Sequence, residues 1–256
     1  MKKKIYVIKV GGKIVEEEGA LHQLLKDFSG IESSKILIHG GGRSATKLAE
    51  QLGIKSTMVD GRRITDADTL RVVTMVYGGL VNKNITAGLQ SLGIDAIGLT
   101  GVDMDVIRSQ KRPVKDIDYG FVGDVEYVRA DILKMLIDKG IVPVLAPLTH
   151  DGKGIMLNTN ADTIAAETAQ ALSEYYDVTL VYCFEKKGVL MNENDDNSVI
   201  PELDRERYKK YVDKKIIQGG MIPKLDNAFR SIDKGVSEVI ITQASDLGKN
   251  GGTHII

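Results

Sequence analysis

The sequence predicts an α/β fold with an open, mostly parallel central sheet and helices on both faces, a three-layer sandwich. The first observation behind this prediction is that short apolar runs alternate with amphipathic segments along the 256 residues. Such alternation is typical of a parallel sheet between two helical layers. The second is the high glycine count, 27 residues, which indicates many tight turns or close backbone approaches. The third is that no apolar run approaches the ~18 residues of a membrane span.

The elements follow one another in a regular order. The expected strands are the short apolar runs, at 5–10, 35–39, 95–101, 142–147, 178–184 and 238–243. The expected helices have amphipathic periodicity, at 21–28, 43–53, after Thr65, at 130–140, at 161–173 and at 222–235. The helix after Thr65 places Leu70, Val73, Tyr77 and Leu80 on one stripe. Pro201 is expected to open a further helical stretch that reaches Lys215.

Two stretches interrupt this rhythm. Residues 114–128 alternate apolar and polar side chains around Gly120 and Gly123, and residues 154–158 follow a glycine-containing turn. Both predict β-hairpins at one end of the sheet. We expect an N-terminal lobe at 1–176 and a C-terminal lobe at 177–256, built around one continuous sheet.

Composition excludes several classes of function. Lys and Arg number 34 against 35 Asp and Glu, for a net charge of −1. This balance argues against a nucleic-acid binder and against a polybasic membrane-surface protein. Cys183 is the only cysteine, so an intrachain disulfide or a cysteine metal site is impossible. We therefore expect a cytoplasmic protein without nucleic-acid or membrane partners.

Two glycine-rich strand ends are candidate anion sites. Lys9 ends an apolar strand and is followed by Gly11 and Gly12. Ligands bind at the carboxyl ends of strands in open α/β sheets, although a lysine at an edge strand would explain Lys9 equally well. The second strand end carries three glycines, 40–42, before a helix. Its free N–H groups and the helix dipole favour an anion.

The same loop allows a different interpretation. Residues 40–45 fit a loose G-x-G-x-x-A pattern, and Asp60 lies about twenty residues further on. This spacing is found in dinucleotide-binding folds, so a nicotinamide-dependent dehydrogenase is an alternative function. That alternative leaves Lys9, Asn158 and Lys224 unexplained.

Three further segments contain polar candidates. Arg63 precedes a helix and could bind a carboxylate through two N–H groups, or remain a solvated surface residue. In LNTNAD (157–162), an extended backbone would put Asn158, Asn160 and Asp162 on one face, while Thr159 and Asp162 fit a helix capping box. Lys224 lies in a first helical turn, where a cation is unfavourable unless an anion is bound.

Together these parts indicate phosphoryl transfer. Two lysines, glycine-rich anion loops and an orienting carboxylate match its need for charge neutralisation and alignment. The sequence contains no G-x-x-x-x-G-K-[ST] motif, no protein-kinase H-R-D or D-F-G motif and no nucleophile–histidine pair with recognisable spacing.

Read as a set, the segments resemble the amino acid kinase family. The motifs occur in family order from one end of the chain to the other: IKVGGK (8–13), HGGG (39–42), GRRIT (61–65), VNKNI (81–85), LNTNAD (157–162), KGVL (187–190), GGMIPK (219–224) and GGTHI (251–255). The resemblance is greatest to members that use ATP to phosphorylate the side-chain carboxylate of N-acetyl-L-glutamate, the second step of arginine biosynthesis.

The resemblance implies roles for individual residues. Lys9 and Lys224 would stabilise charge on the transferring phosphoryl group, and Asp162 would hold both lysines. Backbone N–H groups would bind that phosphate, from Gly11, Gly12, Gly41 and Gly42. The acylated amino acid would be bound by Arg63 and Asn158, bordered by Gly41 and Gly42, with Asn160 beside them. ATP would be bound by Glu185, Lys186, Lys187, Gly188, Val189, Leu190, Ile216, Ile217 and Gln218.

The resemblance also implies that the ATP phosphates hold Mg²⁺, that no protein metal site or tightly bound cofactor is needed, and that the N-terminal lobe forms a homodimer through the helix after Thr65. The family often has a hydroxyl residue and Asp where this chain has Phe184 and Glu185. Arginine-inhibited members carry an additional N-terminal helix, so we expect neither arginine feedback nor a hexamer. N-succinylglutamate, another amino acid of the aminoadipate type, and a non-catalytic amino-acid sensor remain alternatives.

Overall fold

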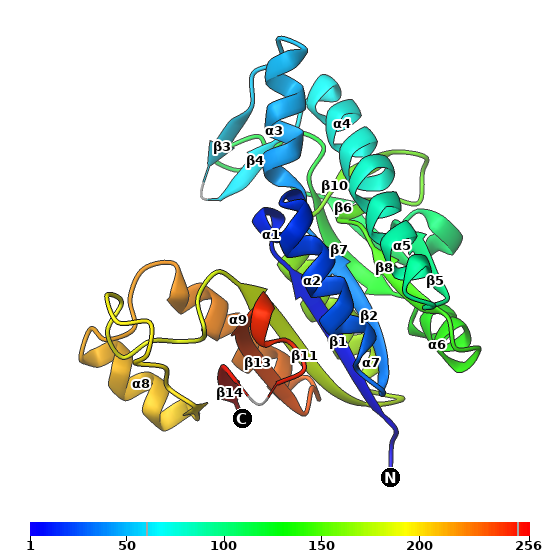
Figure 1. The fold of residues 1–256 in the computed structure, drawn as a ribbon. Helices are drawn as coiled ribbons and strands as arrows, with labels where there is room; N and C mark the ends of the chain where they lie inside the picture. The colour runs from blue at the N-terminus through cyan, green and yellow to red at the C-terminus, as the bar shows by residue number, and fades with distance from the viewer. Residues whose placement is uncertain (60, 250) are drawn as a thin grey trace.

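The computed structural model describes residues 1–59, 61–249 and 251–256. An eight-stranded sheet has the order β12-β14-β13-β11-β1-β2-β8-β5. Figure 1 labels all of these strands except β12. Its strands are β1 (Lys4–Val10), β2 (Ser34–His39), β5 (Ala96–Leu99), β8 (Val142–Leu145), β11 (Asp177–Phe184), β12 (Glu202–Leu203), β13 (Glu238–Gln243) and β14 (Thr253–Ile255). Neighbouring strands are parallel except for the antiparallel pair β13–β14. The predicted open, mostly parallel sheet is therefore confirmed.

Helices cover both faces of this sheet. One face packs against α6 (Ala130–Asp138), α7 (Ala161–Leu172) and α9 (Met221–Asp233), with α8 (Arg205–Asp213) at its border. The other face packs against α1 (Gly12–Glu16), α2 (Glu18–Ser29), α3 (Gly42–Gln51), α4 (Ala67–Val73) and α5 (Asn82–Ser91). Within residues 1–59, 61–249 and 251–256, no helix combines the length and apolar character that a membrane span requires.

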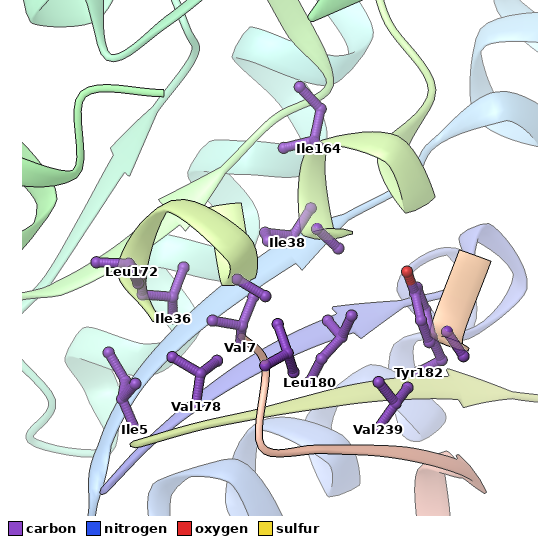
Figure 2. Close-up of a cluster of buried hydrophobic side chains, with 14 of the residues drawn as sticks. Ile5, Val7, Ile36, Ile38, Ile164, Leu172, Val178, Leu180, Tyr182 and Val239 are labelled. Carbon is purple, nitrogen blue, oxygen red and sulfur yellow. The ribbon is translucent and has the colours of Figure 1, made fainter. Parts of the chain in front are cut away.

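Strand β1 shows how the pattern of side chains separates the two cores. Ile5 and Val7 pack in the core under α7, which Figure 2 shows, whereas Ile8 and Val10 pack in the core on the opposite face. Because side chains alternate along a strand, Lys9 shares the face of Ile5 and Val7. The sequence thus directs the Lys9 side chain toward α7.

The two predicted lobes share this sheet. β11, the first strand after the proposed boundary, is parallel to β1 from the pair Lys4–Asp177 to the pair Val10–Cys183. Strands from both sides of the proposed boundary therefore belong to one sheet. It remains a prediction that residues 1–176 bind the N-acyl amino acid and form the dimer, and that residues 177–256 bind ATP.

The long helix after Thr65 differs from the predicted regular helix. α4 and α5 are joined by η1 (Thr74–Val81), a π-helical segment. Val73 and Tyr77 are buried, but Leu80 is 56% exposed. A π-helical turn is wider than an α-helical one, so the predicted stripe loses its register within η1. Leu80 faces outward for that reason.

The two stretches that interrupt the rhythm contribute β7 and β10 to a second sheet, which has the order β10-β9-β6-β7. Its strands are β6 (Ile107–Lys111), β7 (Gly123–Val128), β9 (Leu148–His150) and β10 (Met156–Asn158). The prediction of a hairpin within 114–128 was wrong about its first strand. β7 is antiparallel to β6, which ends at Lys111, before the predicted range begins. The hairpin at 154–158 is present, since β10 is antiparallel to β9. The short antiparallel pair β3 (Thr57–Val59) and β4 (Arg62–Ile64) lies apart.

Pro201 does not open a helix, contrary to the prediction. It is followed by strand β12, and α8 begins only after Asp204. The Asp204 side chain accepts a hydrogen bond from the Arg207 N–H, which is the usual N-cap arrangement. This stronger start signal lies three residues beyond the proline.

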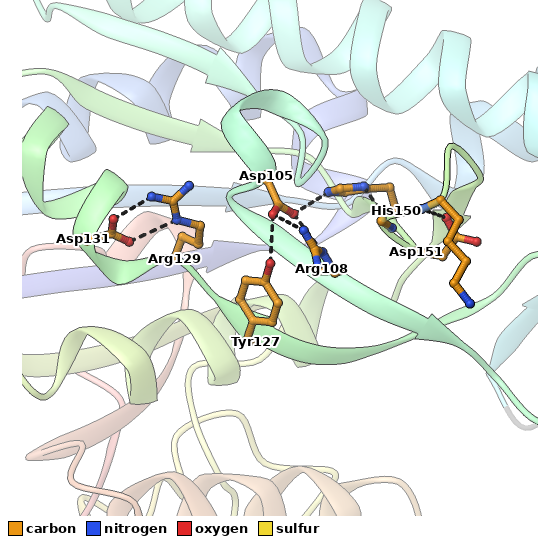
Figure 3. Close-up of polar contacts among 9 residues, drawn as sticks. Asp105, Arg108, Tyr127, Arg129, Asp131, His150 and Asp151 are labelled. Atoms are coloured by element: carbon orange, nitrogen blue, oxygen red, sulfur yellow. Dashed lines mark hydrogen bonds and ion pairs between the residues drawn. The ribbon is translucent and has the colours of Figure 1, made fainter.

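Asp105 connects the strands of the second sheet (Figure 3). Its carboxylate accepts hydrogen bonds from Tyr127 Oη at 2.8 Å, His150 Nε2 at 2.7 Å and Arg108 Nε at 3.2 Å. These donors come from β7, β9 and β6. Desolvation by itself would raise the pKa of Asp105, but the hydrogen bonds from Arg108, Tyr127 and His150 hold it below its usual range. Asp105 also adopts a φ of 55°, which Asp and Asn tolerate best among residues other than glycine.

We expect Asp105→Asn to lower the free energy of unfolding by about 1–3 kcal/mol, because it removes the charge that accepts three hydrogen bonds. Asn keeps the backbone conformation accessible, so strain is not the cause. Urea denaturation measures the change. Asp131→Asn, which removes an exposed carboxylate paired with Arg129, should have little effect. Equal stability of the wild type and Asp105→Asn would contradict a connecting role for Asp105.

Candidate active site

Three neighbouring strands place the candidate segments at one edge of the sheet. β11, β1 and β2 lie side by side and are parallel, so their carboxyl ends meet. Lys9 lies opposite Ile38 on one side and Tyr182 on the other. The glycine loop after β1, the glycine loop after β2 and the segment after Phe184 therefore adjoin.

Lys9, Asp162 and Lys224 come together beside this edge. Lys9 Nζ lies 2.7 Å from Asp162 Oδ1, and both Lys9 and Lys224 lie over the ring of Phe184, at 5.2 and 3.8 Å from its centroid. Burial lowers the pKa of Lys224, while the Asp162 carboxylate raises it and the Lys9 ammonium lowers it. Residues 9, 162 and 224, distant in sequence, thus form one charged group.

The start of α7 differs from the predicted capping box. Asn160, not Thr159, is the N-cap, and its side chain accepts a hydrogen bond from the Thr163 N–H at 3.0 Å. The Thr159 hydroxyl instead pairs with that of Thr149 at 2.9 Å. Asp162 takes no part in capping, which leaves its carboxylate available to Lys9.

The two glycine loops bring backbone amides close together. A Cβ atom on Gly12 would lie 3.6 Å from the Gly41 nitrogen and 3.7 Å from the Gly42 nitrogen. Gly42 begins α3, so the positive end of a helix dipole faces the same point. The Gly11 N–H donates to the Cys183 carbonyl at 3.2 Å. In this structure Gly11 joins β1 to β11, and the amides of Gly12, Gly41 and Gly42 gather at the cleft.

Arg63 is buried beside these amides. Its guanidinium donates hydrogen bonds to Ser56 Oγ, the Gly42 carbonyl and Thr46 Oγ1, each at 2.8 Å. Among the described residues no carboxylate forms an ion pair with it, and it is only 8% exposed. A buried guanidinium without a counter-charge is suited to bind a carboxylate ligand.

A cavity of about 190 Å³ lies beside Arg63. All five residues predicted to bind the amino acid line it: Gly41, Gly42, Arg63, Asn158 and Asn160. Asn158 Nδ2 donates to Thr65 Oγ1 at 3.0 Å, which links β10 to the loop after β4. Tyr77 also lines the cavity, and a Cβ on Gly41 would lie 2.9 Å from its ring. A side chain at position 41 would therefore displace the Tyr77 ring.

Two adjoining cavities lie on the other side of the glycine loops. One of about 610 Å³ is lined by Gly11, Gly12, Glu185, Lys186, Gly188 and Lys224, among others. The next, of about 270 Å³, is lined by the remaining predicted nucleotide residues except Lys187: Val189, Leu190, Ile216, Ile217 and Gln218. Lys186, Gly188 and Met221 line both. The Lys187 ammonium instead donates to Asn197 Oδ1 at 3.0 Å.

Glu185 extends across the cleft. Its carboxylate lies 3.7 Å from Lys13 Nζ and 3.5 Å from Arg43 Nη2, two cations that belong to α1 and α3. All three side chains are largely exposed, so each pair contributes little to stability. The chain thus has an acidic side chain at the cleft entrance, where it meets basic groups from the opposite side.

His39 supports the second glycine loop from within the core. Its Nδ1 lies 2.8 Å from the Gly40 carbonyl and its Nε2 lies 3.1 Å from Asn82 Nδ2. The Gly40 carbonyl oxygen can only accept a hydrogen bond, so Nδ1 carries the proton. The Asn82 amide nitrogen can only donate, so Nε2 accepts and the ring is neutral. A trans peptide directs its C=O and N–H in opposite directions, so holding the Gly40 carbonyl directs the Gly41 N–H away from His39.

Sequence reasoning did not identify Tyr77, His39 or Phe184 as site residues. Each lies in an apolar strand or helix stripe and has the ordinary appearance of a core residue. The repeated glycines next to His39 were the only local signal. Within the described part of the chain, no three His, Cys, Asp or Glu side chains gather as metal ligands. Asp60, needed for the dinucleotide alternative, lies outside the described residues.

The fold and cleft define a phosphotransferase-like α/β protein, and the sequence identifies its family. Residues 4–243 match the amino acid kinase family, so the chain belongs to that family. The chain is 71% identical over 255 residues to the acetylglutamate kinase of Phocaeicola vulgatus, covering 100% of this chain and 99% of that protein.

Solved structures share the fold. The smu.665 protein of Streptococcus mutans UA159 is 29% identical, with a TM-score of 0.79 and coverage of 98% of both chains. The carbamate kinase of Giardia lamblia bound to AMP-PNP is 15% identical, with a TM-score of 0.70, and the match covers 100% of this chain and 99% of that one. The latter likeness concerns the fold alone.

We expect the stability of the protein to decrease between about pH 6.5 and pH 4. Burial lowers the pKa of His39 to about 4 from 6.5; the bond to Gly40 opposes this shift and Lys83 adds to it. Below pH 6.5 the imidazole of the unfolded chain is protonated while His39 in the folded chain stays neutral. The free energy of unfolding therefore falls by up to about 3 kcal/mol as the pH is lowered through this window.

The measurement is the free energy of unfolding against pH for the wild type and His39→Asn. The variant should lack this component of the pH dependence, whereas His22→Asn, which changes an exposed histidine, should keep it. Parallel curves for the wild type and His39→Asn across the window would refute the assignment.

Proposed function

We propose that the protein transfers the γ-phosphoryl group of MgATP to the side-chain carboxylate of N-acetyl-L-glutamate, yielding N-acetyl-L-glutamyl 5-phosphate and MgADP. A carboxylate oxygen forms the new P–O bond, and the bond from the γ-phosphorus to the bridging oxygen of ADP breaks. The observation that carries the proposal is the meeting of Lys9, Lys224 and the glycine amides between two cavities. The full-length likeness to acetylglutamate kinases supports the choice of acceptor.

In this proposal the smaller cavity holds the acylated amino acid. The Arg63 guanidinium pairs with the carboxylate that does not react, and Asn158 with Asn160 borders the rest of the molecule. The reacting carboxylate then points toward Gly12, Gly41 and Gly42. Binding here fixes the acceptor for in-line attack, the main source of acceleration in phosphoryl transfer.

The nucleotide occupies the larger cleft and the cavity beyond it. Residues 185–186, 188–190 and 216–218 surround the base and ribose, and the phosphates extend toward Lys224 and the glycine amides. Mg²⁺ enters as part of the nucleotide and is held mainly by its phosphates. Lys9 and Lys224 stabilise negative charge on the phosphoryl group as it moves. Asp162 pairs with the Lys9 ammonium directly and acts on the Lys224 ammonium only through its charge, without contact.

We expect Lys9→Ala and Lys224→Ala each to reduce kcat by about 10²–10³-fold, because each removes a positive charge from the transition state. Arg63→Ala should mainly raise the KM for N-acetyl-L-glutamate, because its contact is made equally in the ground state. ADP release at saturating MgATP measures these constants. Wild-type turnover in both lysine variants would rule out the proposed chemistry.

We also propose that the N-terminal lobe forms a homodimer through the helix α4–η1–α5. Apolar side chains gather on its outer side, where Met75 and Leu80 are 52% and 56% exposed. A groove that includes Met75 is also lined by Leu52, Ile54, Leu70, Ile155 and Met156. Exposed apolar patches of this kind mark protein interfaces, and a second copy can cover the same helix by two-fold symmetry.

The double variant Met75→Lys/Leu80→Lys should shift the protein from dimer to monomer, because four buried charges per dimer oppose association. Analytical ultracentrifugation measures the mass. Met135→Lys, which places the same charge at an exposed methionine of α6, serves as the control and should remain dimeric. A wild type that sediments as a monomer would defeat the proposal directly.

A further inference from the structure

Phe184 lies where the two lysines of the site converge. It is the last residue of β11, and its ring lies parallel to that of Tyr182, with centroids 5.8 Å apart and an interplanar angle of 6°. Tyr182 is buried and lies opposite Lys9 on β1. The ring of Phe184 lines the cleft of about 610 Å³. Packing thus fixes this ring at the point where the cavity begins.

The two ammonium groups have different partners. Lys9 Nζ has the Asp162 carboxylate at 2.7 Å and the Phe184 ring at 5.2 Å. Lys224 Nζ has the Phe184 ring at 3.8 Å, and within residues 1–59, 61–249 and 251–256 it makes no ion pair or hydrogen bond with another side chain. The aromatic face is therefore the direct partner of Lys224.

The kind of partner matters for a cation that must act on phosphate. A carboxylate in contact with Lys224 would neutralise its charge and accept one of its N–H donors. The face of an aromatic ring attracts an ammonium group through its quadrupole and accepts no full negative charge. A lysine held in this way keeps its positive charge and its donors for an incoming phosphate.

Position on the helix makes such support necessary. Lys224 is the fourth residue of α9, where the helix dipole is unfavourable for a cation. Burial and the nearby Lys9 charge add to this cost, and the Asp162 carboxylate offsets part of it through its charge, without contacting Lys224. Without an attractive partner, the long flexible side chain would turn toward solvent, away from the cleft.

We infer that Phe184 is a positioning residue that holds the Lys224 ammonium in the phosphate cleft through a cation–π contact. The inference rests on the proposed function, because it assigns Lys224 to the phosphate. Phe184 itself contacts no reacting atom. It acts through Lys224, and its effect should therefore appear in turnover more than in the binding of N-acetyl-L-glutamate.

The first test compares Phe184→Leu with Phe184→Tyr in steady-state assays of N-acetyl-L-glutamate phosphorylation. Leu removes the aromatic face and keeps an apolar side chain, so kcat should fall about 10-fold, within the range of a partly desolvated cation–π contact. The KM for N-acetyl-L-glutamate should stay within about two-fold. Tyr keeps the aromatic face, so kcat should be restored to within about three-fold of the wild type.

Phe229→Leu is the matched control. Phe229 lies on the same helix as Lys224, and its ring carries the Arg205 guanidinium at 4.9 Å, outside the cleft. This variant loses a ring of the same size and an equivalent contact, so it reports on general destabilisation. Turnover of the folded Phe229→Leu protein should match the wild type. A loss equal to that of Phe184→Leu would show that the effect comes from packing.

A second measurement does not depend on activity. In protein labelled with ¹³C-lysine, the ε-CH₂ signal of Lys224, identified by its loss in Lys224→Ala, should be shifted upfield by the ring current of Phe184. The shift should vanish in Phe184→Leu and persist in Phe184→Tyr. An unshifted signal in the wild type, or unchanged kcat in Phe184→Leu, would overturn the inference. An inactive wild type that shows the shift would instead contradict the proposed function alone.

Discussion

The ion pair between Lys9 and Asp162 is the contact on which the site depends. It joins the carboxyl end of β1 to the first turn of α7, and its two atoms lie 2.7 Å apart. Lys9 is only 8% exposed, and an ammonium group buried to this extent requires a compensating charge. The pair thus fixes one cation at the sheet edge and sets the position of α7 relative to it.

Around this pair the cleft is built to receive negative charge. Lys224, Arg63 and the N-terminus of α3 all direct positive charge toward the same region. Among the residues that the structure describes, Asp162 is the acidic group that pairs with Lys9. Mutual repulsion between these cations is unfavourable before substrate binds. A bound polyanion with a carboxylate beside it would relieve that repulsion. The same positive groups would therefore bind the substrates and stabilise the charge of the transition state.

Apolar and neutral residues hold the charged ones in place. His39 fixes the Gly40 carbonyl, Tyr77 closes against Gly41, and Phe184 lies under Lys224. Each is anchored in one of the two cores that flank the sheet. Rigid support of this kind keeps donors aimed at the phosphate without reorganisation during the reaction. The cores therefore stabilise the fold and also define the geometry of the cleft.

The sequence by itself determined the α/β class, six of the eight strands of the main sheet and the glycine-rich segments that follow two of them. These depend on periodicity and on glycine placement, which neighbouring residues encode. Tertiary structure decided the pairing of β7 with β6, the outward turn of Leu80 and the capping of α7 by Asn160. It also placed Phe184 beneath Lys224. Such contacts join residues far apart in the chain, and their energies depend on strand order and on packing that no local pattern contains.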